Sequence, residues 1–306
     1  MSKIVKLKHF LYFGSNKKSL LMKRIIVPID FSPKSLKGLE LAIIYANKFN
    51  SDLQMVFVQG QKPGKFHIKL ENQYNEALEE FEKLISKFKT KLHQDCKFSY
   101  IIKSGKIQEE VAHQAEAFDD SMIICSTNGE SGFSDYIIGS NAYRIVQSTE
   151  NPVITVTSEK YIGKVDKIVM PLDITKETRE KVPLVAKIAK AFDSEVHIIK
   201  VTSSTNEGIH NKLKMYATQV KKYFDEKGIK YQSSLLVGDN ITESTIEYAK
   251  TIDADLIAIM TEQTTTLANF LLGSYAYQML NTSPIPVLSI TPKGIYFTYG
   301  MRTTGG

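Results

Sequence analysis

Short apolar runs alternate with helical patterns along most of the chain. The first run, "IIVPI" from residue 25, predicts a buried strand. The apolar residues of the next segment recur at helical spacing, at Leu36, Leu39, Ile43 and Ala46. Ser32 and Pro33 suit the start of that helix. A serine hydroxyl can accept a hydrogen bond from a free backbone amide at the helix start, and proline has no backbone N–H that would be left without a partner. The pattern therefore predicts a strand followed by an amphipathic helix.

The same alternation continues to about residue 157. The runs "LQMVFV", "KFSYII", "SMIIC" and "PVITV" predict four further strands, separated by helical patterns. One of these helices, around residues 70–92, is long and rich in Glu and Lys, which is typical of a solvated face. Strands that alternate with helices form parallel sheets covered on both faces. This part of the chain is thus predicted to be a five-stranded α/β domain.

The second half of the chain repeats the first. "KRIIVPIDFS" from Lys23 matches "DKIVMPLDIT" from Asp166, at an offset of 143 residues (166 − 23). "IGSNAYRIVQSTENPVITV" from Ile138 matches "LGSYAYQMLNTSPIPVLSI" from Leu272, at an offset of 134 (272 − 138). Such self-similarity marks a tandem repeat. The expected organisation is a leader at 1–22, a domain at 23–157, a linker at 158–166, a second domain at 167–292 and a tail at 293–306.

Basic residues concentrate in the leader. Residues 1–24 hold seven Lys and Arg and no acidic residue, so the rest of the chain has 32 basic (39 − 7) and 33 acidic residues. A nearly neutral body lacks the electrostatic footprint of a nucleic-acid-binding protein, and no apolar run approaches the roughly 18 residues of a membrane span. The leader has no signal-peptide pattern and is expected to be disordered or dispensable. Two cysteines without a disulfide framework predict a cytoplasmic protein.

Each half resembles a universal stress protein domain, and the chain as a whole resembles a tandem-domain member of that family. The resemblance rests on an ordered set of features: the "VPID" opening, the glycine turns at Gly105 and Gly238, the Gly-Ser pairs at Gly139 and Gly273, and the closing "PV" strands. It implies two doubly wound, five-stranded parallel sheets of the adenine-nucleotide α-hydrolase-like kind, each with strand order 3-2-1-4-5. It also implies dimerisation through the fifth strands. We therefore expect the two domains to pair within one chain.

The family's nucleotide-binding pattern, G-x2-G-x9-G-[S/T], occurs in the first half with one change. It reads Ser126-x2-Gly129-x9-Gly139-Ser140, so serine replaces the first glycine. The resemblance implies that this loop holds the phosphates of ATP, with or without Mg²⁺. The residues it assigns to binding are Asp30 and Val58 on the base side, and Cys125, Ser126, Gly129, Gly139, Ser140 and Asn141 on the phosphate side.

Physical reasoning points to the same place. Open parallel sheets bind ligands at the carboxyl ends of the strands where the winding reverses. With the family's strand order this reversal lies between the first and fourth strands, which end near Asp30 and Ser126. Backbone amides of a glycine loop, and of the helix that starts near Ser140, can hold a phosphate tail without any lysine.

The second half departs from the pattern. Its aligned run begins Met260-Thr261-Glu262-Gln263, so both loop glycines are missing and Glu262 would repel phosphate. We therefore expect ATP in the first domain only. Plainer interpretations stay open for the first half: Asp30 could be only a strand-end turn residue, and Gly129 could be only a loop turn. Tyr143 and Tyr277, which recur at equivalent helix positions, are expected to be packing residues.

Three functions remain open at this stage. The first is an ATP-binding regulatory or stress-response protein, and the second is a nucleotide-independent structural or interaction module of the same fold. The third, an enzyme of nucleotide or phosphoryl transfer, is disfavoured because the six histidines show no metal-ligand or catalytic spacing. We expect no metal site, no catalytic residues and at most slow incidental ATP hydrolysis. Expected partners are an adenine nucleotide, a second copy of the chain as a homodimer, and proteins that the sequence does not identify, but no nucleic acid and no membrane.

Overall fold

The computed structural model describes residues 22–60, 67–126, 140–156, 163–261, 263–266 and 269–293. The first half, domain 1, contains β1 (Arg24–Pro28), α1 (Pro33–Phe49), β2 (Asp52–Gly60), α2 (His67–Phe88), η1 (Lys89–Lys91), β3 (Phe98–Gly105), α3 (Ile107–Glu116), β4 (Ser121–Ser126), α4 (Ser140–Ser148) and β5 (Val153–Val156). The second half, domain 2, contains β6 (Lys167–Leu172), η2 (Glu177–Arg179), α5 (Val182–Phe192), β7 (Glu195–Thr202), α6 (Glu207–Lys227), β8 (Lys230–Val237), α7 (Ile241–Thr251), β9 (Leu256–Met260), β10 (Gln263–Thr266), β11 (Asn269–Leu272), α8 (Ser274–Thr282) and β12 (Val287–Ile290).

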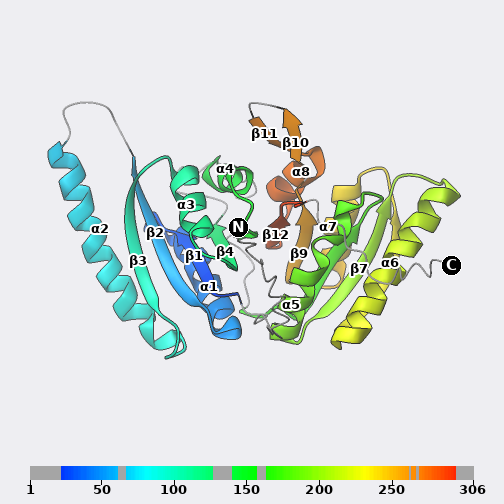
Figure 1. Cartoon of the computed structure of the whole chain (residues 1–306), viewed down its shortest axis with the longest axis horizontal. Coiled ribbons are helices and arrows are strands. Elements are labelled where there is room, and N and C mark those ends of the chain that lie inside the picture. Colours follow the sequence, from blue (N-terminus) through cyan, green and yellow to red (C-terminus); the bar gives the residue numbers. More distant parts are fainter. Residues whose placement is uncertain are drawn as a thin grey trace, which may run out of the picture.

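Ten of these strands form one continuous sheet. Its order is β3-β2-β1-β4-β5-β12-β9-β6-β7-β8 (Figure 1). Counted within each domain, this is the order 3-2-1-4-5, and the neighbouring strands within each domain are parallel. The predicted fold class, two tandem α/β domains with doubly wound parallel sheets, is confirmed.

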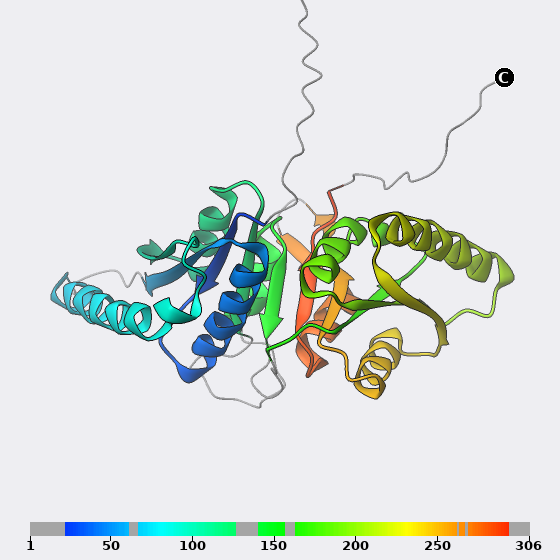
Figure 2. The same ribbon diagram turned by 90° about the horizontal axis from the view of Figure 1, so that it is seen from below.

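The two domains are joined by their fifth strands. β5 and β12 pair antiparallel, with Ile154 opposite Leu288 and Thr155 opposite Val287 (Figure 2). The Thr155 hydroxyl also donates a hydrogen bond of 3.4 Å to the carbonyl of Val287. The exposed edges that "PVITV" and "PVLSI" would otherwise present are thereby removed. The prediction that the two copies pair within one chain is confirmed.

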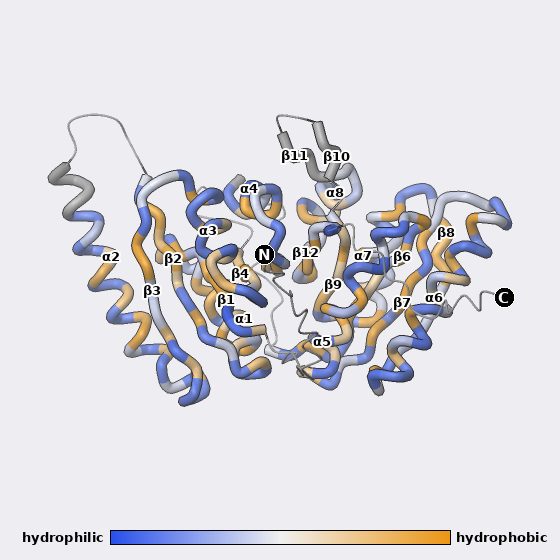
Figure 3. Tube along the Cα trace, viewed as in Figure 1, coloured by the Kyte–Doolittle hydropathy of each residue, from blue (hydrophilic) through white to orange (hydrophobic). Residues whose placement is uncertain are grey.

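Helices cover both faces of the sheet. Along β1, Ile25 and Val27 face the apolar layer beneath α1 and α2, whereas Ile26 faces the layer beneath α3 and α4. Domain 2 repeats this arrangement with α5 and α6 on the first face and α7 and α8 on the second. Figure 3 shows the apolar positions concentrated in the inner strands, while α2 and α6 alternate apolar and polar positions. Each apolar layer therefore runs through both domains.

The start of α1 follows the sequence prediction. Ser32 is the N-cap, its hydroxyl accepts a hydrogen bond of 3.1 Å from the Ser35 amide, and Pro33 is the first helical residue. The helix ends at Phe49, and its C-cap, Asn50, has a left-handed backbone with φ of 53°. The charged helix predicted at residues 70–92 is α2, which the 3₁₀ turn η1 extends to Lys91.

Domain 2 contains a hairpin that the sequence did not predict. Between β9 and α8, the strands β10 and β11 form an antiparallel hairpin, with Gln263 opposite Leu272. β11 contacts α4 of domain 1. The corresponding segment of domain 1, residues 127–139, lies outside the described residues. In the part of the chain that the structure describes, no helix is both long enough and apolar enough to cross a membrane.

Candidate functional site

The winding of domain 1 reverses between β1 and β4. These strands are neighbours, with Ile26 opposite Ile123. The helix after β1, α1, packs on one face of the sheet, and the helix after β4, α4, packs on the other. Continuing the register brings Ser126, the last residue of β4, level with Ile29 and next to Asp30. The structure thus places these two predicted site residues at the same carboxyl edge of the sheet.

Asp30 makes the turn between β1 and α1. Its Oδ1 accepts hydrogen bonds from the Ser32 amide at 3.0 Å and from the Ser32 hydroxyl at 2.6 Å. The same turn recurs in domain 2, where Oδ1 of Asp173 accepts from the amide and hydroxyl of Thr175 at 2.6 and 2.5 Å. The Asp30 side chain remains exposed. One carboxylate oxygen of Asp30 therefore has a structural role in starting α1.

Helix α1 approaches the end of β4 closely at Gly38. A Cβ atom on Gly38 would lie 3.2 Å from the Ser126 backbone nitrogen and 3.5 Å from the Cys125 carbonyl carbon. The shorter distance is tighter than ordinary van der Waals contact, so a side chain here would push the helix away from the strand end. Glycine permits the close approach and adds no side chain beside Ser126.

The remaining predicted site residues differ in how exposed they are and in which element contains them. The Cys125 side chain is only 2% exposed, and burial raises the pKa of its thiol to about 12. Only its main chain can therefore face a ligand. Val58 is half-buried and packs against the apolar layer beneath α3 and α4, and Asn141 is exposed near the start of α4. Ser140 is the first residue of α4, and Gly129 and Gly139 lie outside the described residues.

The equivalent position in domain 2 carries a lysine. Lys181 corresponds to Gly38 at the 143-residue offset of the repeat (181 − 38). It immediately precedes α5, and its side chain is 1% exposed. Its ammonium donates a hydrogen bond of 3.2 Å to the Thr178 hydroxyl. Burial lowers the pKa of Lys181 to about 8, and the nearby Asp173 carboxylate partly opposes this shift.

A tyrosine takes the place of Asn141 in domain 2. Tyr275 corresponds to Asn141 at the second offset of the repeat (275 − 141 = 134). Its hydroxyl oxygen is buried. Burial raises the pKa of this hydroxyl, the neighbouring Thr245 lowers it, and the Asp173 carboxylate raises it. The Tyr275 hydroxyl therefore lies in the interior of domain 2, beside Thr245 and within electrostatic range of the Asp173 carboxylate.

The same family model matches both halves of this repeat. The match to the universal stress protein family covers residues 22–157 and 164–290. This chain belongs to the universal stress protein family. Universal stress protein Slr1230 of Synechocystis sp. is 22% identical over 293 residues, which cover 88% of this chain and 99% of that protein. Universal stress protein MJ0531 of Methanocaldococcus jannaschii is 25% identical over 150 residues, which cover 46% of this chain and 85% of that protein.

A solved structure shares the tandem fold of this universal stress protein. The crystal structure of a universal stress protein from Archaeoglobus fulgidus has a TM-score of 0.74 and covers 88% of this chain and 98% of its own. The two sequences are 17% identical, so the likeness concerns the fold. That the matched region spans nearly the whole of both chains agrees with two family domains in a single polypeptide.

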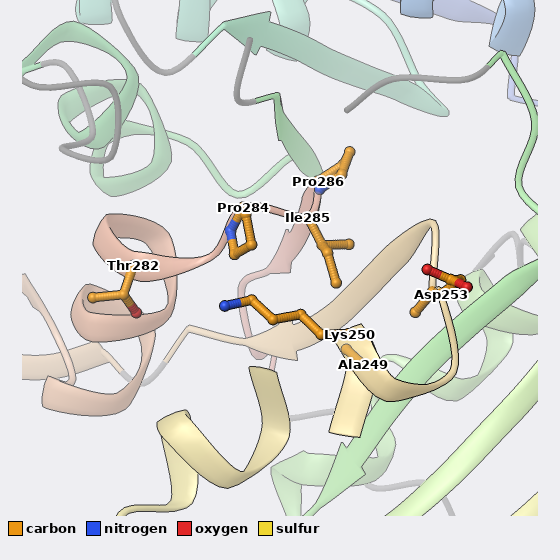
Figure 4. Close-up of a pocket in the computed structure, with 8 residues that line it drawn as sticks. Ala249, Lys250, Asp253, Thr282, Pro284, Ile285 and Pro286 are labelled. Atoms are coloured by element: carbon orange, nitrogen blue, oxygen red, sulfur yellow. The ribbon is translucent and has the colours of Figure 1, made fainter. Parts of the chain in front are cut away.

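A hollow in domain 2 of this universal stress protein lies away from the predicted binding edge. It has a volume of 500 Å³ and is lined at the starts of β9 and β12 by residues that include Asp253 and Pro286. Lys250, at the end of α7, extends into it (Figure 4). Parallel sheets bind ligands at the carboxyl ends of their strands. This hollow, at the amino ends, is therefore separate from the predicted nucleotide position.

Neither Gly38 nor Lys181 stands out in the sequence alone. A single glycine within a helical pattern is tolerated at a cost of about 1 kcal/mol relative to alanine, and a lysine is common in helices and normally exposed. The signal that identifies them is the repeat itself, because the constant offset aligns Gly38, in the second turn of α1, with Lys181, which immediately precedes α5. Among the described residues, no group of three or more His, Cys, Asp and Glu side chains is placed to hold a metal ion.

Proposed function

We propose that this universal stress protein binds ATP in domain 1 and acts as a cytoplasmic regulatory or stress-response protein. The observation that carries the proposal is the close approach of α1 to β4 at Gly38, where an added Cβ would lie 3.2 Å from the Ser126 nitrogen. Because residue 38 is a glycine, no side chain from α1 lies beside the main chain of Ser126 at the edge where the winding reverses. Main-chain amides at such an edge are suited to a phosphate tail.

The neighbouring residues support the same position. Asp30 is exposed, and one of its oxygens is fixed by the turn, so the carboxylate is oriented before any ligand arrives. Helix α4 begins at Ser140, and the first amides of a helix have no partner within that helix. The base would lie toward Asp30 and Val58, and the phosphates toward Ser126, Gly129 and the start of α4.

We propose this role for domain 1 only. The aligned segment of domain 2 lacks both loop glycines and contains Glu262, whose carboxylate would repel phosphate. Part of the same segment forms the β10–β11 hairpin. A hairpin directs its backbone amides toward the partner strand, so fewer of them are available to a ligand.

Binding rather than turnover is proposed because the described side chains at this edge supply no activated nucleophile. The Cys125 thiol is buried and its pKa is raised to about 12, so it is not a thiolate at neutral pH. One oxygen of Asp30 is already engaged in the turn that starts α1.

Titration calorimetry with Mg-ATP tests the proposal. One site per chain is expected. Gly38→Val should weaken binding at least tenfold, because the side chain would enter the space beside Ser126, whereas Gly60→Val is the matched control, because a Cβ there meets nothing within 4 Å. Gly129→Glu should cost about 2–4 kcal/mol of binding free energy, because it brings a carboxylate to the phosphate side.

Ser126→Gly distinguishes an ATP-binding regulatory protein from a nucleotide-independent interaction module. It restores the family residue and should keep or strengthen binding. If neither the natural chain nor Ser126→Gly binds any adenine nucleotide, the nucleotide-independent interaction module is favoured.

A further inference from the structure

We infer that Lys181 and Tyr275 together fill, in domain 2, the position that the proposed function gives to nucleotide in domain 1. Domain 2 would then be closed by its own side chains, and not only by the loss of its loop glycines. The inference rests on the proposed function for the identity of the ligand that is excluded. Its structural basis is the replacement of Gly38 by Lys181 and of Asn141 by Tyr275.

The first contribution comes from the helix on one face of the sheet. Gly38 lies where α1 closely approaches the end of β4, and Lys181, at the equivalent position of the repeat, immediately precedes α5. The Lys181 side chain is 1% exposed, which shows that it lies inside the domain. Its ammonium is held by the Thr178 hydroxyl at 3.2 Å. Thr178 also accepts a hydrogen bond of 3.2 Å from the Asp173 amide.

The second contribution comes from the helix on the opposite face. Tyr275 lies near the start of α8, and its buried hydroxyl lies beside Thr245 of α7 and close enough to Asp173 to interact with that carboxylate. Asn141, its counterpart in domain 1, is exposed. A short exposed side chain in one domain is thus replaced by a long, inward-directed one in the other.

Both side chains converge on Asp173. This residue is the counterpart of Asp30 and lies at the turn after β6, where the winding of domain 2 reverses. Lys181 is linked to the Asp173 amide through the Thr178 hydroxyl on the α5 face, and the buried Tyr275 hydroxyl lies within electrostatic range of the Asp173 carboxylate on the α8 face. The lysine charge also compensates the Asp173 carboxylate, and a buried charge of one sign is tolerated when an opposite charge is near. The filled crevice therefore presents neither space nor net charge to an incoming nucleotide.

The test is to open domain 2 with the residues that domain 1 carries. The variant combines Lys181→Gly and Tyr275→Asn, and the probe is AMP. AMP has the base and the ribose but only one phosphate, so it needs the fewest contacts from the segment that forms the β10–β11 hairpin. Calorimetry should show one more AMP site per chain in the variant than in the natural protein. The affinity of this additional site should be at least tenfold higher than that of any second AMP site in the natural protein. The matched control, Lys181→Met with Tyr275→Phe, keeps most of the side-chain volume and should gain no site.

The outcomes separate this inference from the proposed function. If the natural chain binds no nucleotide but the opened variant binds one, the proposed function fails and the inference stands. A folded opened variant with no additional site overturns the inference, and so does an additional site in the volume-keeping control. If the double variant does not melt cooperatively, AMP binding is measured for the single variants Lys181→Ala and Tyr275→Leu. The inference is also overturned if neither single variant gains AMP binding.

Discussion

Tyr143 of α4 and Tyr277 of α8 occupy equivalent positions in the two domains and meet edge to face. Their ring centroids are 5.4 Å apart and their planes are at 90°. The sequence predicts packing roles for both, and the structure shows that they pack against each other. The contact joins two helices that follow the predicted nucleotide loop of domain 1 and the aligned segment of domain 2. It therefore connects the two helix starts across the junction of the domains.

The tyrosine pair should be energetically coupled. Tyr143→Ala and Tyr277→Ala are each expected to lower the free energy of unfolding, and the double variant should lose less than the sum, by about 0.5–1.5 kcal/mol, because aromatic pairs contribute that much beyond their buried area. Urea unfolding of all four proteins measures the coupling. Tyr74 on α2 is 45% exposed and lies outside this pair, so Tyr143→Ala combined with Tyr74→Ala should be additive. Additive losses in the tyrosine pair itself would contradict the prediction.

Lys181→Met should stabilise the protein at neutral pH. The pKa of Lys181 is lowered from 10.5 to about 8 in the folded protein, so folding disfavours its charged form by up to about 3 kcal/mol at pH 7. Between pH 8 and 10.5 the folded state binds fewer protons than the unfolded state, so the free energy of unfolding of the natural protein rises with pH across that window. The advantage of the methionine variant should shrink over the same range.

Urea unfolding at pH 7 and pH 10 checks this prediction. Lys190→Met is the control, because Lys190 is exposed on the same helix, α5. An equal gain from both substitutions, or a gain from Lys181→Met that does not change with pH, would show that the effect is not that of a buried charge.

The two cysteines should differ in reactivity. Cys125 is buried, and burial raises the pKa of its thiol to about 12, whereas Cys96 is half-buried with its pKa raised by burial and by Asp52 and Asp95. A thiol reagent at pH 8 should modify Cys96 slowly in the folded protein and reach Cys125 only after unfolding, since the thiolate is the reactive form. Mass spectrometry counts the labels. Cys96→Ser should abolish labelling of the folded protein, and a persistent label on Cys125 would mean that β4 opens locally.

Asp30→Asn should distinguish the role of Asp30 in the turn from its proposed contact with ATP. Asparagine keeps the Oδ1 acceptor for the Ser32 amide and hydroxyl, so stability should change little, whereas Asp30→Ala should cost about 1 kcal/mol through the weakened helix start. If the carboxylate contacts bound ATP, Asp30→Asn should lower the affinity at least tenfold in calorimetry. Asp173→Asn in domain 2 is the matched control and should leave the affinity unchanged. An unchanged affinity for Asp30→Asn would limit Asp30 to its turn.

Much of the fold could be predicted because local patterns and the final packing agree. The apolar runs became the strands of the main sheet, and Ser32 and Pro33 start α1 as expected. The pairing of "PVITV" with "PVLSI" also followed, because two apolar edges in one chain are most stable when they cover each other. The β10–β11 hairpin was missed, since its segment was interpreted only as an altered nucleotide loop. The Thr residues in "QTTT" are β-branched and could have indicated a strand.

The candidate site could be predicted only in part. The sequence indicates the edge of the sheet at which the structure brings Asp30 and Ser126 together, because strand order determines where the winding reverses. It does not reveal that Cys125 is turned into the core or that Lys181 is buried, because each depends on how a helix sits on the strands. Gly129 and Gly139, with the loop that joins them, lie outside the described residues, so their roles remain predictions.

The antiparallel β5–β12 junction has a consequence for how this protein can change over evolutionary time. In a symmetric homodimer of single domains, every substitution appears in both subunits at once, so neither binding position can be lost without the other. Here the two domains pair through β5 and β12 but are encoded by separate stretches of one gene. A lysine can therefore replace glycine at position 181 while position 38 keeps its glycine. Domain 2 can therefore accumulate substitutions at its strand ends that domain 1 does not share.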